Sequence, residues 1–134
     1  MTAATTFSRV TFTATALMAG GGAFAFDWNA THIYNPTWPG HAKFHNAQTM
    51  STGAALALVT AGSAWWPGRW TRQRLDLTAG AASLYWVTQL SAAAYPGTTM
   101  LDDPPRRFGP QTAVAGICLV LNTVAYAVGR RQVR

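Results

Sequence analysis

The sequence predicts an all-α protein, an integral membrane four-helix bundle with both termini in the cytoplasm. Of the 134 residues, 49% are hydrophobic and only 10% are charged, whereas a soluble domain carries about 25% charged residues. Four apolar segments contain no charged residue, and each approaches the roughly 20 helical residues that cross a hydrocarbon core. The basic residues gather on one side of this arrangement, which is typical of multi-pass proteins.

Each predicted span ends at a recognisable signal. Arg9 precedes the first span, a Pro-Gly pair follows the second and the third, and Gly129 with two arginines follows the fourth. Tryptophan and tyrosine lie near several of these ends, where their amphipathic rings suit the headgroup region. The predicted spans are residues 10–26, 47–66, 77–95 and 112–128, joined on the outer side by loops 27–46 and 96–110.

The distribution of charge orients the chain. Seven of the ten basic residues fall on the side of the two termini, and only Lys43, Arg106 and Arg107 fall on the other. Because positive loops stay inside, we expect cytoplasmic termini in a plasma (inner) membrane. Residues 23–25 have the Ala-x-Ala form of a signal cleavage site, but we expect the first span to remain uncleaved.

Two classes of function are disfavoured by composition. The basic residues are few and stand in short clusters between apolar segments, which argues against nucleic-acid binding. Cys118 is the one cysteine, so an internal disulfide and a multi-cysteine metal site are excluded. We expect Cys118 to be a small buried residue, and Asn122 to form a hydrogen bond with another helix.

The polar chemistry of the chain is concentrated in the first outer loop and the start of the second span. All three histidines lie within residues 27–49, although a plain connector needs only about five residues. Gly40 is a plausible helix cap, so we expect a helix to begin near His41. His41, His45 and Gln48 then share one face with Thr49 and Thr52, and we expect this stripe to face the bundle interior because polar groups are costly in lipid.

We therefore expect a pocket at the outer interface, lined by Asp27, His32, His41, His45, Gln48 and Gln89. The loop 96–110, which contains Asp102 and Asp103, is expected to lie over or beside it as a lid. The expected catalytic residues are Asp27, His32, His41 and His45. The expected substrate-binding residues are Asn35, Trp38, Asn46, Gln48, Tyr85, Trp86 and Gln89.

The favoured function is a small membrane enzyme that applies acid–base chemistry to a lipophilic small molecule, as an isomerase, cyclase or epoxide hydrolase does. This chemistry needs no cofactor. One alternative is a divalent metal on His41 and His45, whose i, i+4 spacing suits a shared ion, with His32, Asp27 or the lid aspartates completing the site. Another is a non-catalytic accessory subunit of a membrane complex. The expected partners are a hydrophobic small molecule or lipid, the bilayer and, as a further alternative, copies of the same chain.

Residues 32–49 follow the pattern HxxNPxWPxHAKFHNxQT. This segment resembles the signature of a largely uncharacterised family of small four-helix membrane proteins of bacteria and fungi. The resemblance implies the four-helix fold and a site that includes His32, Asn35, His41, His45 and Gln48. It implies no particular reaction.

Overall fold

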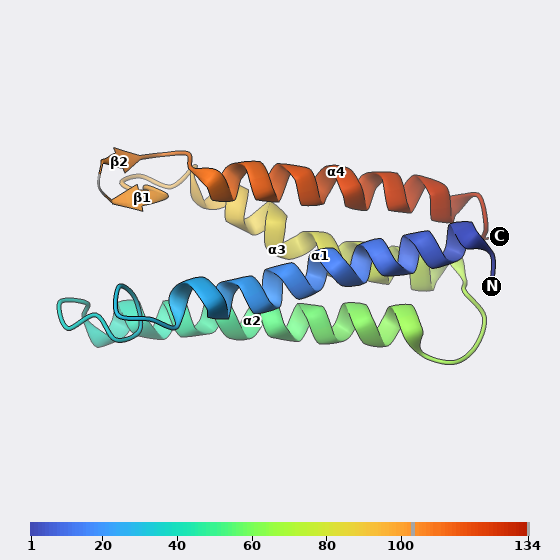
Figure 1. Ribbon diagram of the computed structural model, residues 1–134, viewed down its shortest axis with the longest axis horizontal. Coiled ribbons are helices and arrows are strands. Elements are labelled where there is room, and N and C mark those ends of the chain that lie inside the picture. Colours follow the sequence, from blue (N-terminus) through green and yellow to red (C-terminus); the bar gives the residue numbers. More distant parts are fainter. Residues whose placement is uncertain (103, 134) are drawn as a thin grey trace.

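Four long helices make up most of the computed structural model, which describes residues 1–102 and 104–133. The helices run side by side along the long axis, and both termini lie at one end (Figure 1). The opposite end carries the loop between the first two helices and a short antiparallel hairpin. The elements are α1 (Ala3–Asp27), α2 (Gly40–Trp65), α3 (Arg72–Ala92), β1 (Leu101–Asp102), β2 (Pro105–Arg106) and α4 (Pro110–Arg130). The prediction of an all-α, four-helix chain is confirmed.

Each predicted span overlaps one helix, with differences at the ends. The helix α2 begins at Gly40, which agrees with the expected start near His41. The helix α3 ends at Ala92, three residues before the predicted end. The backbone forms a turn after α3, in which the amide of Tyr95 donates a hydrogen bond to the carbonyl of Ala92. Pro96 lacks the amide hydrogen that a continuing helix would need.

Among the described residues, α4 is the one helix that is both long and apolar enough to pass as a membrane span by length and composition. The other three helices fall short because glycine, threonine and serine lower their mean hydropathy, and α2 and α3 also begin with polar and charged residues. Length and hydropathy alone therefore do not support the four predicted spans.

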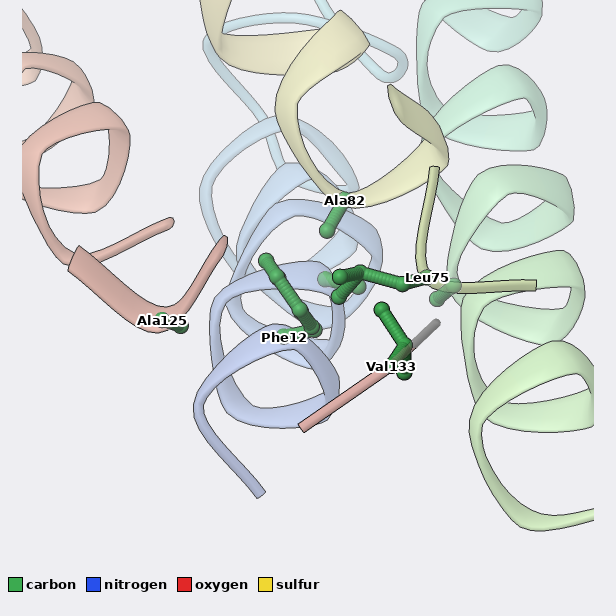
Figure 2. Close-up of a cluster of buried hydrophobic side chains, with 7 residues drawn as sticks. Phe12, Leu75, Ala82, Ala125 and Val133 are labelled. Atoms are coloured by element: carbon green, nitrogen blue, oxygen red, sulfur yellow. The ribbon is translucent and has the colours of Figure 1, made fainter. Parts of the chain in front are cut away.

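The core is built from small side chains around a few large ones. Phe12 and Leu75 are fully buried and pack with Ala82, Ala125 and Val133 (Figure 2). Figure 2 shows these side chains meeting between α1, α3, α4 and the C-terminal segment. A second cluster contains Ala19, Trp86, Ala115 and Cys118. Cys118 is buried, which confirms its expected burial.

The helices α1 and α2 make backbone contact where two glycines meet. A Cβ atom on Gly20 would lie 3.1 Å from the carbonyl oxygen of Gly53, and a Cβ on Gly53 would lie 3.1 Å from that of Ala19. The ring of Tyr85 from α3 is also 3.2 Å from the position of the Gly53 Cβ. Small residues of this kind allow helix backbones to approach closely. This contact fixes the face of α2 that is turned toward α1.

Asn122 links three helices in the buried interior. Its Oδ1 accepts a hydrogen bond of 2.7 Å from the Thr15 hydroxyl, and its Nδ2 donates to the carbonyl of Ala82 at 3.2 Å and to the Ser83 hydroxyl at 3.1 Å. The expected interhelical hydrogen bond of Asn122 is confirmed. Buried polar groups are normally hydrogen-bonded in this way, because an unpaired buried amide is costly.

Candidate functional site

Two asparagine turns shape the loop between α1 and α2. Asn29 Oδ1 accepts hydrogen bonds from the amide and the hydroxyl of Thr31 at 2.8 and 2.7 Å. Asn35 Oδ1 accepts in the same way from Thr37 at 2.9 and 2.8 Å, and Asn35 Nδ2 donates to the carbonyl of Thr31. Asparagine commonly forms such turns with the backbone two residues ahead. The amide of Asn35, one of the expected substrate-binding residues, is thus engaged in building the loop.

The carboxylate of Asp27 joins the end of α1 to the loop and to α2. Its Oδ2 accepts a hydrogen bond of 2.9 Å from Asn46 Nδ2, and its Oδ1 lies 3.9 Å from His32 Nε2. The His32 ring meets Trp38 edge to face, with 5.1 Å between ring centroids. The structure therefore brings together Asp27, His32, Trp38 and Asn46 in one half-buried cluster, which we call the Asp27 cluster.

His41 and His45 form a second group on α2. Their Nε2 atoms lie 3.0 Å apart, and the two rings are nearly perpendicular at 82°. His45 Nδ1 lies 3.4 Å from Gln48 Oε1. We call these three residues the histidine relay.

The hydrogen-bond pattern assigns the protons in the neutral relay. The amide oxygen of Gln48 can only accept, so His45 Nδ1–H donates to it. His45 Nε2 then holds a lone pair and accepts from His41 Nε2–H. The remaining lone pair is on His41 Nδ1, which has no hydrogen bond to a described residue. This nitrogen is therefore the available proton acceptor of the relay.

The relay lies on an exposed face, so the expectation that the polar stripe faces the bundle interior is wrong. His41, His45, Gln48, Thr49 and Thr52 are all exposed. The face of α2 that contacts α1 includes Asn46 and Gly53, and successive helical residues are rotated by about 100°. The close glycine contact with α1 therefore turns the stripe roughly a third of a turn away from that interface.

A groove of about 160 Å³ begins beside the relay. It lies between α2 and α3, and its lining residues are Gln48, Thr49, Thr52, Tyr85 and Thr88. The structure thus brings Tyr85 to Gln48, two of the expected substrate-binding residues. Sequence analysis missed Thr88, whose i, i+3 spacing from Tyr85 was the available signal.

Two other expected binding residues lie elsewhere. Trp86 is only 3% exposed and packs in the core against Ala19, Ala115 and Cys118. Gln89 lines a separate cavity of about 170 Å³ between α3, α4 and the segment that joins them. The expected single pocket is therefore wrong, because α3 presents Tyr85 and Gln89 to different neighbours. The Gln89 cavity shares no lining residue with the groove beside the relay.

The loop 96–110 contacts α3 and α4 in the described part of the chain. Arg107 Nε donates to the carbonyl of Ala93 at 2.7 Å, and the Thr112 hydroxyl lies 3.0 Å from Met100 Sδ. The expectation that this loop covers the histidines is therefore wrong. The loop packs instead on the end of α3 and the start of α4. Asp103 lies outside the described residues, so its expected place in the lid is not described.

No group of three or more histidine, cysteine, aspartate or glutamate side chains that could hold a metal is found among residues 1–102 and 104–133. The structure therefore does not bring His32 and Asp27 together with His41 and His45 into one candidate metal site. Among the described residues, a metal bound at the relay would have His41 and His45 as its two protein ligands.

The opposite end of the bundle is held by stacked arginines and tryptophans. The guanidinium carbons of Arg9 and Arg74 lie 4.6 and 5.6 Å from the ring centroid of Trp70. Arg74 also donates to the carbonyls of Ser63 and Trp66, so it caps the C-terminal end of α2. Burial, followed by the charge of Arg74, lowers the pKa of Arg9. These contacts hold the loop between α2 and α3 against α1, at the end of the bundle where most of the basic residues lie.

Comparisons with known proteins give one match. Neither curated proteins nor solved structures include a protein that matches this chain. A family described as a family of unknown function, DUF6640, matches residues 11–134. The match includes all four helices apart from the first residues of α1. The chain therefore belongs to the DUF6640 family.

Proposed function

We propose that this protein is a multi-pass membrane enzyme that moves protons on a lipophilic small molecule at the outer interface. The membrane placement is supported by helix lengths of 25, 26, 21 and 21 residues, each near the span of a hydrocarbon core. Large apolar side chains are turned outward, including Leu17, Leu58 and Val120, which are 57%, 74% and 64% exposed. Apart from a few large side chains such as Phe12 and Leu75, the buried interior holds small and polar residues, a distribution that lipid favours and water does not.

The distribution of charge supports the orientation of this bundle. Both termini lie at one end (Figure 1), and the described basic residues there are Arg9, Arg69, Arg72, Arg74, Arg130 and Arg131. The positive-inside rule assigns that end to the cytoplasm. The relay and the Asp27 cluster then lie at the outer headgroup level, where water and lipid both reach them.

The observation that carries the proposed chemistry is the 3.0 Å contact between His41 Nε2 and His45 Nε2, on the helix face that continues to Gln48 in the lining of the groove. His41 Nδ1 would take a proton from the substrate, and the contact with His45 would stabilise the imidazolium that forms. Gln48 orients His45, as a third group orients the base in other nucleophile and proton-transfer sites. This mechanism needs no cofactor.

The groove indicates the kind of substrate. Hydroxyl and amide groups of Thr49, Thr52, Thr88 and Gln48 line a cavity that opens on the outer surface of the helices. In a bilayer this surface faces lipid. A substrate would therefore reach the groove laterally from the bilayer, with its apolar part remaining in the membrane. A lipophilic molecule with one polar group, such as an epoxide, an enone or a polyene alcohol, fits these contacts.

The test is a deuterium-exchange screen with protein reconstituted in lipid nanodiscs. Lipophilic epoxides, enones and polyenes are incubated in D₂O, and mass spectrometry detects isomerised, cyclised or hydrolysed products and incorporated deuterium. His41→Ala and His45→Ala should each lower turnover by about 10²–10⁴-fold. Lys43→Ala, on the same turn of α2, is the matched control and should retain turnover. Equal turnover in all three variants would overturn the proposal and favour a non-catalytic subunit.

A second candidate is a metal site at the same pair of histidines. Two Nε2 atoms 3.0 Å apart can both reach one ion at the Zn–N distance of about 2.0–2.1 Å. Binding of the metal would then replace the hydrogen bond between the two rings. Elemental analysis distinguishes the two candidates, because a metal site predicts about one equivalent that is lost in the His41→Ala/His45→Ala variant and kept in His32→Ala. Protein without metal would exclude this candidate.

A further inference from the structure

The exposed face of α2 carries residues at the spacing of a coiled-coil seam. Six exposed positions follow one another at intervals of four, three, four, three and four residues. This spacing averages about 3.5 residues, the repeat at which two helices pack side by side. We call this row the α2 seam, and its residues are His41, His45, Gln48, Thr52, Ala55 and Val59.

The α2 seam lies opposite the face of α2 that packs in the bundle. The buried residues of this helix are Met50, Gly53, Ala57, Thr60 and Ala64. Because successive helical residues are rotated by about 100°, these residues and the seam fall on opposite sides of the helix. The seam is thus turned away from the other helices of the described chain.

The outer half of the α2 seam is polar and lacks partners. Gln48 contacts His45 through its amide oxygen, which leaves its amide nitrogen without a hydrogen bond to a described residue. The Thr52 hydroxyl also has none. In the proposed membrane placement this face would meet lipid, where polar groups are costly. A second copy in the same orientation would present the same groups, and because an amide or a hydroxyl can donate and accept, each can pair with its counterpart.

The two outermost positions of the α2 seam are the histidines of the relay. Their Nε2 atoms are 3.0 Å apart, close to the roughly 3.3 Å that separates two nitrogen ligands of a tetrahedral zinc ion. Structural zinc sites use four ligands, whereas the described part of one chain brings only two together here. A second copy paired along α2 brings its own His41 and His45 to the same end, and four imidazoles then complete the ligand set.

We propose that α2 pairs with α2 of a second copy along this seam, and that the four histidines at its outer end bind one divalent ion that prefers imidazole, such as zinc. Ala55 lets the two backbones approach, since small residues favour close packing of helices in lipid. The metal takes the lone pairs of all four Nε2 atoms and replaces the hydrogen bond within each relay. This inference rests on the membrane placement and the metal candidate proposed above, and it does not rest on proton transfer.

The experiment measures the mass and the metal content of the full chain in detergent by native mass spectrometry. Zinc is the probe, and magnesium, which prefers oxygen ligands, is the control ion. We expect a dimer with one zinc per two chains, and zinc at ten times its dissociation constant should strengthen this dimer about tenfold. Monomers with one zinc per chain would overturn the inference. Protein that binds no zinc, or that dimerises equally with magnesium, would also overturn it.

Substitution of the histidines identifies the ligands. His41→Ala and His45→Ala each remove one ligand from each copy, so that two ligands remain at the paired site. Each variant should lose the zinc-dependent dimer. His32→Ala is the matched control and should retain it, because His32 lies in the loop before α2. Loss of the dimer in His32→Ala as well would overturn the assignment of the ligands.

Cross-linking tests the α2 seam without metal. In a Cys118→Ala background, Ala55→Cys should form a disulfide-linked dimer when proteoliposomes are oxidised with diamide. Val120→Cys is the control, since Val120 is exposed on α4, which does not pack against α2 in the described chain. Absence of the cross-link at Ala55→Cys, or equal cross-linking at both positions, would overturn the seam.

The outcomes separate this inference from the proposed enzyme. Turnover by protein that stays monomeric and binds no zinc would overturn the inference and leave the enzyme standing. A zinc-bridged dimer without turnover would support the inference and contradict the enzyme. Failure of the chain to insert into bilayers would overturn the membrane placement and the inference with it. Circular dichroism of each variant checks that the helices are retained.

Discussion

His41 Nε2 and His45 Nε2 lie 3.0 Å apart, one helical turn from each other on the exposed face of α2. A contact of this length needs one ring to donate and the other to accept. The pair therefore holds together only while at least one of the two nitrogens is unprotonated. The same lone pair is what a base or a metal ligand requires.

The glycine contact between α1 and α2 should be sensitive to a single methyl group. Gly53→Ala would place its Cβ 3.1 Å from the carbonyl oxygen of Ala19, and overpacking of this kind costs about 1–3 kcal/mol. Gly62→Ala on the same helix meets no atom within 4 Å and should be neutral or stabilising by up to about 1 kcal/mol. Thermal unfolding in detergent compares the two variants. Equal effects would show that α1 and α2 do not touch at Gly53.

Asn122 should contribute more to stability than a neighbouring threonine. Asn122→Ala removes the partner of the Thr15 hydroxyl and the donor to Ala82 in the interior, which should cost about 1–3 kcal/mol. Thr123→Ala is the control, because the exposed Thr123 hydroxyl bonds only to Leu119 of its own helix. Thermal unfolding should separate the two variants, and a neutral Asn122→Ala would argue against the bridge between the three helices.

The proposed orientation makes the two ends of the bundle distinguishable in cells. In a Cys118→Ala background, a new thiol from Ala30→Cys should react with a membrane-impermeant maleimide added outside. A thiol from Gln73→Cys, exposed near the basic end, should react only after permeabilisation. Labelling of both from outside would contradict the orientation, and labelling of neither would contradict the exposed loop.

Much of the fold can be predicted from local sequence. The Pro39-Gly40 step starts α2, and Pro96 prevents α3 from continuing, because proline restricts the backbone before and at its own position. Asn122 in an otherwise apolar segment indicates an interhelical bond. The Asp27 cluster could be anticipated in part, since Asp27 ends α1, His32 follows in the loop, and Asn46 lies in the second turn of α2.

The sequence by itself determined four helices, their approximate ends and the gathering of the histidines at one end of the chain. Only the tertiary structure decided which face of each helix meets a neighbour. Interior and outer faces are both largely uncharged here, so a polar stripe does not show which way it points. The Gly20–Gly53 contact, between residues far apart in sequence, rotates α2 so that His41 and His45 face outward. The packing of α3 likewise separates Gln89 from Tyr85, because close contact rather than hydrophobicity sets helix rotation in such a bundle.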